Sequence, residues 1–153
     1  MLVNNVFGID LGTNNIKIYN KSDDSIMVEK NMIAIENKST LFAYGNSAFD
    51  MYEKAPSNIH ISYPLCNGVI ADIKNMETIV RYFIQDLMKG SIKPADYYIA
   101  VPTDVTEVEK RAFYDLTSSS ALSGASASIK MACAPFSYSG RAASSFAPRP
   151  CAR

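Results

Sequence analysis

Short apolar runs separated by turn residues fill the first part of the chain. Five segments carry apolar side chains in runs or in alternation and are predicted to be strands: residues 6–10, 16–19, 31–36, 41–45 and 59–63. Only about five residues separate the first two strands, so we expect them to form an antiparallel hairpin. A short helix is predicted over residues 47–54.

An amphipathic helix over residues 75–89 is the strongest helical signal. Its apolar side chains recur with the i, i+3, i+4, i+7 spacing of one helix face: Met76, Ile79, Val80, Phe83, Ile84, Leu87 and Met88. Asn75 is expected to cap the start of this helix, and Gly90 is expected to end it. The stripe has no polar member, which indicates core packing rather than a ligand site.

A further strand and helix follow. Residues 97–101 are predicted to be a strand that Pro102 terminates. Thr106 and Glu109 have the spacing of a capping box, which opens another helix. The order of strands, a small inserted unit, helix, strand and helix predicts a mixed α/β fold, with a helix-linked parallel strand added to an antiparallel start.

The residue composition changes abruptly near Leu116. Every acidic residue lies at or before Asp115, and about half of residues 117–153 are Ser or Ala, with no Asp, Glu or Asn among them. One interpretation is a basic, disordered interaction tail. The other is a non-native segment, such as a frameshift or a cloning scar. We favour the second interpretation and exclude residues 117–153 from the predicted fold.

Composition and charge exclude several classes of protein. The formal net charge is zero, so nothing indicates a nucleic-acid partner. The N-terminus lacks the pattern of a signal peptide and no apolar run is long enough to span a bilayer, which predicts a cytoplasmic protein. Cys66, Cys133 and Cys151 form no CxxC pair and the chain has a single histidine, so a structural zinc site is not expected and the cysteines are predicted to be free thiols.

The turn after the first strand is the candidate binding site, and it reads Asp10-Leu11-Gly12-Thr13-Asn14-Asn15. Phosphate binding needs converging backbone N–H donors with no bulky Cβ in the way. Gly12 permits a close approach, and Thr13, Asn14 and Asn15 offer successive amides. Asp10 is placed to hold a hydrated Mg²⁺ against the phosphates. An ordinary hairpin turn is the alternative, because Gly and Asn favour turns anyway.

Two known phosphate motifs do not fit this turn. The chain has no GxxxxGK[ST] sequence, and the element after the turn is a strand rather than the helix of a GxGxxG motif. Lys17 follows closely enough to reach a phosphate, but its alternation with Ile16 and Ile18 favours a solvated strand face. Asp72 could face a cleft, cap a helix or lie exposed.

The segment Phe7-Gly8-Ile9-Asp10-Leu11-Gly12-Thr13-Asn14-Asn15 resembles the first phosphate motif of the actin/Hsp70/sugar-kinase superfamily. Later segments resemble the MreB family of bacterial actin homologues in order and in spacing: residues 55–59, 64–72, 81–83 and 101–112. The resemblance covers about residues 6–116. Asn14 is a mild departure, because the family usually has Ala there.

This resemblance implies an actin-like ATPase fold. Residues 1–116 would form part of the ribonuclease H-like subdomain IA, with the small subdomain IB inserted at about residues 31–72. The amides of Gly12, Thr13, Asn14 and Asn15 would hold the phosphates of ATP, and Asp10 would support Mg²⁺ through water. Family members form ATP-dependent, membrane-associated filaments that determine rod shape, so the implied partners are other copies of the chain, the inner membrane surface and the cell-wall synthesis machinery.

The resemblance also implies that much of the family's machinery is missing. The family's catalytic carboxylate, second phosphate loop and adenosine pocket lie beyond the point that Leu116 matches, and residues 117–153 contain no acidic side chain to act as a base. We therefore expect an N-terminal fragment that is not an ATPase by itself. Two alternatives stay open: a fragment of an Hsp70-like chaperone ATPase, and a non-enzymatic interaction module.

Overall fold

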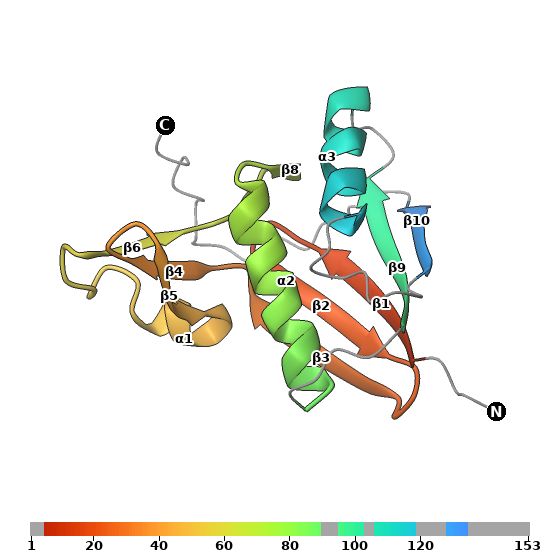
Figure 1. Ribbon diagram of the computed structural model, residues 1–153, viewed down its shortest axis with the longest axis horizontal. Helices are drawn as coiled ribbons and strands as arrows, with labels where there is room; N and C mark the ends of the chain where they lie inside the picture. Colours follow the sequence, from red (N-terminus) through yellow and green to blue (C-terminus); the bar gives the residue numbers. More distant parts are fainter. Residues whose placement is uncertain (1–4, 90–94, 103–105, 119–127, 135–153) are drawn as a thin grey trace, which may run out of the picture.

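A five-stranded mixed sheet is the main body of the computed structural model, which describes residues 5–89, 95–102, 106–118 and 128–134 (Figure 1). The strand order is β10-β9-β1-β2-β3. Strands β1 (Asn5–Leu11), β2 (Asn15–Asn20) and β3 (Ser25–Lys30) form an antiparallel meander. Strand β9 (Ala95–Pro102) pairs parallel to β1, and β10 (Ser128–Ala134) pairs parallel to β9. The predicted hairpin and the predicted parallel addition are both confirmed.

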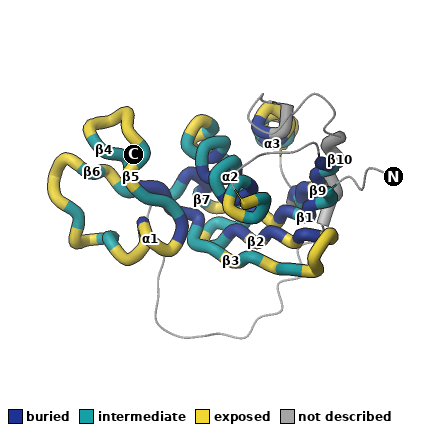
Figure 2. Tube along the Cα trace, turned by 60° about the horizontal axis from the view of Figure 1, so that its bottom comes forward, coloured by how far each residue is buried: buried dark blue, intermediate teal, exposed yellow. Residues whose placement is uncertain are grey.

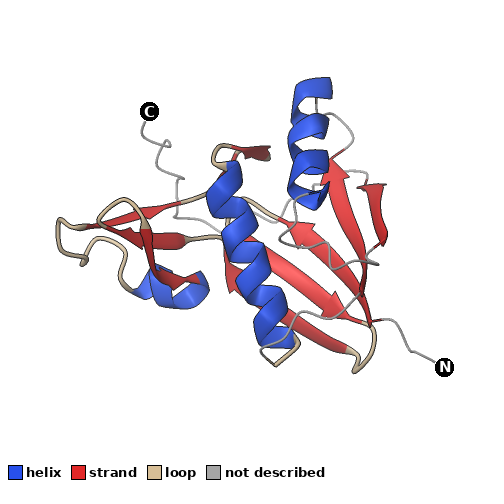
Figure 3. Ribbon diagram, viewed as in Figure 1, coloured by secondary structure: helices blue, strands red, loops and turns tan. Residues whose placement is uncertain are grey.

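Helices α2 (Ile73–Leu87) and α3 (Glu107–Ser118) pack on one face of this sheet (Figure 3). Alternate strand residues point toward them and are buried: Phe7, Ile9, Leu11, Ile16, Ile18, Tyr97, Ile99 and Val101. These side chains form one core with the apolar stripe of α2 and with Phe113 and Leu116 of α3. The prediction of an amphipathic helix with a core-facing stripe is confirmed.

The other face of the sheet is much more exposed, and Figure 2 shows the alternation of buried and exposed positions along the strands. Tyr19 on β2 and Tyr98 on β9 are both 39% exposed, and Ile26 on β3 is 69% exposed. Strand β3 was not predicted, because its run of apolar residues does not alternate with polar ones and therefore lacks the period of a half-buried strand.

A small lobe is inserted between β3 and α2, and it lies on the left in Figure 1. Its antiparallel sheet has the order β5-β4-β6, formed by β4 (Ile33–Glu36), β5 (Thr40–Tyr44) and β6 (Ile59–Ser62), and the short helix α1 (Gly45–Asp50) follows β5. These strands confirm three predictions, with β4 and β6 shorter than predicted and β5 shifted by one residue. The Tyr44 hydroxyl donates to Asp86 of α2 at 2.8 Å. Burial raises the pKa of Tyr44 to about 12, so the hydroxyl stays protonated at neutral pH.

The start of α2 differs from the prediction. Asp72 is the N-cap, and its side chain accepts a hydrogen bond from the amide of Asn75 at 3.0 Å. The assignment of Asn75 as the cap is therefore wrong, because the helix begins two residues earlier, at Ile73. Of the three roles considered for Asp72, the structure assigns it the cap. Gly90, the predicted helix end, lies outside the described residues.

The capping box of α3 is confirmed, since Thr106 and Glu109 each bond the other's backbone amide through their side chains, at 2.6 and 3.3 Å. Beyond α3, the structure differs from the expectation that residues 117–153 stand outside the fold. Strand β10 lies in this segment and extends the main sheet beside β9. Apolar periodicity did not reveal it, because the Ser/Ala-rich composition masks a strand pattern.

A two-stranded hairpin joins the small lobe to α2 and was not predicted. It consists of β7 (Leu65–Cys66) and β8 (Val69–Ile70), with Gly68 in its turn at φ +80°. Strands of two residues are too short to leave a period in the sequence. This hairpin matters because it contacts the candidate site.

Candidate phosphate-binding turn

The candidate site is the tight turn at residues 12–15, between β1 and β2. The Gly12 amide donates to the Asn15 carbonyl at 3.0 Å and closes the turn. A Cβ added to Gly12 would lie 2.6 Å from that carbonyl oxygen, closer than such atoms approach in proteins. Glycine is needed here because the turn closes on itself. The predicted reason for glycine was instead the close approach of a phosphate. The Gly12 amide itself already has a partner, the Asn15 carbonyl.

Asn31 holds the turn from behind. Its side-chain Nδ2 donates to the Gly12 carbonyl at 2.9 Å, and its backbone amide donates to the Asn14 carbonyl at 3.0 Å. The Asn31 side chain is fully buried at the point where β3 leads into the small lobe. Sequence reasoning missed this residue, because its only signal was membership of a predicted strand over residues 31–36.

The β7–β8 hairpin holds the turn from another side. The amide of Gly68 donates to the Thr13 hydroxyl oxygen at 3.2 Å, across 55 positions of the chain. Cys66, two residues before Gly68, is disulfide-bonded in the structure. The expectation that every cysteine is a free thiol is therefore wrong for Cys66.

These contacts leave particular donors free. Among the described residues, the amides of Thr13 and Asn14 donate to no acceptor, whereas the Gly12 and Asn14 carbonyls are both occupied. Thr13 and Asn15 are half-buried, and Asn14 is exposed. Unpaired successive amides in a tight turn favour an anion, because their partial positive charges have no internal acceptor. The arrangement therefore suits phosphate oxygens.

Asp10 and Lys17 lie beside the turn as direct cross-strand neighbours. The Lys17 Nζ lies 3.4 Å from the Asp10 Oδ2, and both side chains are more than half exposed, at 57% and 56%. This agrees with the solvated position favoured for Lys17. An exposed ion pair of this kind contributes little to stability. The Asp10 carboxylate is therefore available to a ligand at small cost.

The described residues contain no group of three or more His, Cys, Asp or Glu side chains that could hold a metal ion. A cation at Asp10 would have to complete its coordination shell with water and with ligand oxygens. Mg²⁺ binds in this manner, through one or two carboxylates and several waters. The single carboxylate thus fits hydrated Mg²⁺ and does not fit a zinc or calcium cage.

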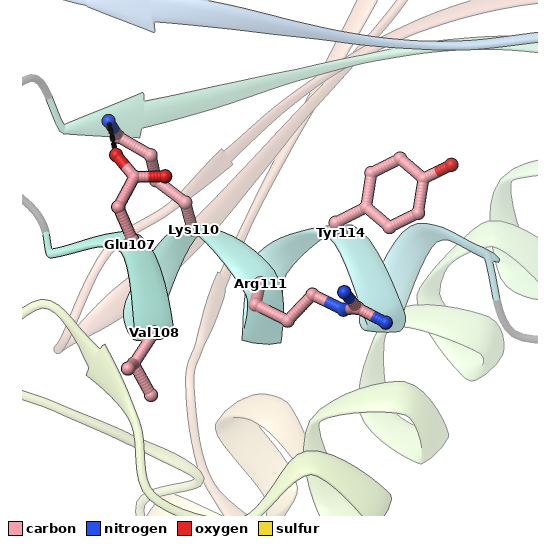
Figure 4. A pocket seen from close by; sticks show the side chains of 5 residues that line it. All are labelled: Glu107, Val108, Lys110, Arg111 and Tyr114. Carbon is pink, nitrogen blue, oxygen red and sulfur yellow. Dashed lines mark hydrogen bonds and ion pairs between the residues drawn. The ribbon is translucent and has the colours of Figure 1, made fainter.

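A second concave region lies on α3 and is not a credible site. Glu107, Val108, Lys110, Arg111 and Tyr114 line it. Figure 4 shows these side chains spreading outward from one helix. The Glu107 and Lys110 side chains form an ion pair at 2.6 Å. All of the lining belongs to a single exposed helix surface, so the region lacks the enclosing walls of a ligand pocket. In the part of the chain that is described, no helix is long and apolar enough to cross a membrane.

Comparisons with known proteins agree on one family. A family model described as MreB/Mbl protein matches residues 4–131, a range that passes through the turn and ends within β10. The cell shape-determining protein Mbl of Bacillus cereus is 37% identical over 107 residues, which are 69% of this chain and 32% of that protein. The cell shape-determining protein MreB of Escherichia coli K12 is 32% identical over 118 residues, covering 72% of this chain and 34% of that protein.

A solved structure shows the same fold. The crystal structure of MreB 5 of Spiroplasma citri bound to AMPPNP superposes with a TM-score of 0.71 and 26% sequence identity, covering 86% of this chain and 39% of that one. The chain thus spans about a third of the length of the curated relatives that it matches.

Proposed function

Because the chain belongs to the MreB/Mbl protein family, we propose that it binds the phosphates of ATP at the turn between β1 and β2. The observation that carries this proposal is the pair of amides at Thr13 and Asn14, which have no acceptor among the described residues, in a turn whose Gly12 and Asn14 carbonyls are held by Asn31. The family membership replaces the Hsp70-like alternative. A relative solved with AMPPNP supports a nucleotide as the ligand.

Each predicted site residue then has a distinct role. The amides of Thr13 and Asn14 donate to phosphate oxygens, and the Asn14 and Asn15 carboxamides offer further donors from the side chains. Gly12 shapes the turn, because its own amide is bonded to Asn15. Asp10 holds a hydrated Mg²⁺ next to the phosphates. Mg²⁺ would supply charge neutralisation of the phosphate oxygens.

We propose further that the whole protein assembles into filaments that determine rod cell shape. The cell shape-determining names of the curated relatives support this role. The main partners are then other copies of the same chain. Further partners of this cytoplasmic protein are the inner membrane surface and the cell-wall synthesis machinery. Light scattering and electron microscopy of the family-length protein with and without MgATP test this. Scattering that does not rise on addition of MgATP would count against it.

Phosphate binding by this chain is tested by thermal unfolding of the 153-residue protein with MgATP, magnesium tripolyphosphate and adenosine. A ligand at a hundred times its Kd stabilises the folded state by about 2.7 kcal/mol, which raises the Tm of a domain of this size by several degrees. We expect stabilisation by the two phosphate ligands and none by adenosine, because the site consists of phosphate-facing amides.

The matched variants are Asp10→Ala beside the turn and Asp50→Ala at the end of α1, an exposed carboxylate in the small lobe. Asp10→Ala should weaken the Mg²⁺-dependent stabilisation, and Asp50→Ala should leave it unchanged. A cooperatively folded chain whose Tm does not respond to either phosphate ligand would show that these residues do not bind phosphate without the rest of the protein.

A further inference from the structure

We propose that Asn31 is the positioning residue of the phosphate-binding turn, which it orients by holding the carbonyls of Gly12 and Asn14. The inference rests on the proposed function of the turn. It starts from two hydrogen bonds of one residue to one turn, the side-chain bond to the Gly12 carbonyl at 2.9 Å and the backbone bond to the Asn14 carbonyl at 3.0 Å.

Because of peptide geometry, these two hydrogen bonds also fix the directions of two backbone N–H groups, those of Thr13 and Asn15. In a planar trans peptide, the carbonyl of one residue and the N–H of the next residue point in opposite directions. The described residues contain no cis peptide bond. Since the Gly12 carbonyl points at Asn31, the Thr13 amide points away from Asn31. The Asn14 carbonyl directs the Asn15 amide away from Asn31 in the same manner.

Packing alone does not account for an asparagine at this position. The Asn31 side chain is 0% exposed, and its Oδ1 has no hydrogen-bond partner among the described residues. A buried polar atom without a partner is costly, and an apolar side chain of similar size would avoid that cost. The interaction that an apolar residue could not make is the Nδ2 bond to the Gly12 carbonyl.

The segment around Asn31 is itself firmly held. The Lys30 amide donates to the Asn46 side chain at 3.3 Å, and the Gly45 amide donates to the Met32 carbonyl at 2.9 Å. Both partners lie at the start of α1. Asn31 is therefore fixed between the main sheet and the small lobe, so it can act as a rigid support for the turn.

The test replaces Asn31 by aspartate in the full chain. Asn31→Asp keeps the size of the side chain and the backbone amide, but it places an acceptor oxygen opposite the Gly12 carbonyl. The matched control is Asn20→Asp, at the far end of β2, where the Asn20 side chain is 6% exposed and accepts from the Ser22 amide at 3.0 Å. Aspartate retains that acceptor, so the bond at Ser22 survives.

The first readout is the affinity for MgATP, which is measured from the ¹⁵N–¹H chemical shifts of the Thr13 and Asn14 amides during a titration. We expect Asn31→Asp to bind about tenfold more weakly, the effect of losing a buried hydrogen bond, and Asn20→Asp to bind as the parent does. Equal affinity of the parent and Asn31→Asp would overturn the positioning role and would leave the proposed phosphate site standing.

The second readout needs no ligand. Residual dipolar couplings and ¹⁵N relaxation report the direction and the order of the Thr13 and Asn15 N–H vectors in the free protein. In Asn31→Asp the Thr13 vector should change more than the Asn15 vector, because the backbone bond to the Asn14 carbonyl is kept, and both vectors should stay unchanged in Asn20→Asp. If the parent does not bind MgATP, the proposed function fails for this chain. The positioning role of Asn31 is then decided by the N–H vectors alone, and vectors that do not change in Asn31→Asp would overturn that role.

A milder variant covers the case in which Asn31→Asp does not fold. Asn31→Ser removes the carboxamide, introduces no charge and keeps the backbone amide. The same two readouts then apply, with the Thr13 amide, which follows the released Gly12 carbonyl, expected to change more than the Asn15 amide. Equal behaviour of the two amides, with the affinity unchanged, would overturn the proposal.

Discussion

The β1–β2–β3 meander contains two tight turns that differ in what occupies their backbone amides. The turn at residues 12–15 is held by partners far along the chain, Asn31 and Gly68. In the turn between β2 and β3, side chains of the turn itself accept from two of its amides, while the Lys21 amide and the Ser22 hydroxyl bond to Val6 and Asn5 of β1. There the Asn20 side chain accepts from the Ser22 amide at 3.0 Å, and the Asp23 side chain accepts from the Ser25 amide at 3.2 Å.

This difference separates a structural turn from a binding turn. Side chains of the second turn occupy its Ser22 and Ser25 amides, as is usual for Asx turns. In the first turn, Asn31 occupies the Gly12 and Asn14 carbonyls, and the Thr13 and Asn14 amides have no acceptor in the described part of the chain. Hydrogen-bond donors that point outward without a partner are what an anionic ligand requires.

Among the variants that test the difference between the two turns, Gly12→Ala should have the largest effect on stability and on MgATP binding. The added Cβ would lie 2.6 Å from the Asn15 carbonyl oxygen, so the turn must open. We expect a loss of about 1–3 kcal/mol in the free energy of unfolding, as for an overpacked site, together with the loss of stabilisation by MgATP. Thermal and urea unfolding measure the first, and the ligand-dependent Tm measures the second.

Gly8→Ala is the matched control on the same strand. Its Cβ would meet the Tyr19 Cβ at 3.8 Å, which is an ordinary contact. The variant should therefore change stability by less than about 1 kcal/mol and leave the MgATP response intact. Equal losses in the two variants would show that closure of the first turn has no special importance.

Sequence reasoning found the two sides of the hairpin but not what holds its turn. The strands that flank residues 12–15 follow from short apolar runs, and the α2 stripe follows from its helical period. The Gly12, Thr13, Asn14 and Asn15 string drew attention to the turn. It left an ordinary hairpin open, however, because the same residue types occur in both kinds of turn.

The missing information was long-range. Asn31 and Gly68 contact the turn only because the chain returns to it after 19 and 55 residues. No local period records such a contact. The same limit explains β10, whose partner β9 is distant in sequence and whose own residues show no strand pattern. Local signals predict the elements and the pairing of strands joined by a short turn, and they do not predict contacts such as those of Asn31 and Gly68 with the turn.

Thr13→Val should have an intermediate effect. Valine keeps the shape of threonine but removes the oxygen that accepts from the Gly68 amide at 3.2 Å. The free energy of unfolding should fall by about 1 kcal/mol, and the Gly68 amide should exchange its hydrogen faster. Hydrogen exchange followed by NMR measures the second effect at the single amide.

Ser22→Ala is the matched control in the second turn. It removes an exposed hydrogen bond from the Ser22 hydroxyl to Asn5 at 3.0 Å. A change within about 0.5 kcal/mol is expected for such a surface position, with no change in exchange at Gly68 or in the MgATP response. Unaltered protection of the Gly68 amide in Thr13→Val would show that the β7–β8 hairpin does not hold the first turn.

The smallest expected effect is a pH dependence confined to the second turn. The Ser25 hydroxyl donates to the Asp23 carboxylate at 2.6 Å, and this bond, followed by the Ser25 amide, lowers the pKa of Asp23 below its ordinary value of 3.8. A carboxylate whose pKa is lowered on folding stabilises the protein above its unfolded pKa, and that stabilisation is lost as the pH falls through the folded pKa. We therefore expect Ser25→Ala to raise the pKa of Asp23 toward 3.8 and to flatten the stability profile below about pH 4.

An NMR titration of the Asp23 carboxyl measures the shift directly, with MgATP binding as the control that should not change. An unchanged pKa in Ser25→Ala would mean that the Ser25 hydroxyl does not hold Asp23, and side-chain support of the second turn would then rest mainly on the bond between Asn20 and the Ser22 amide.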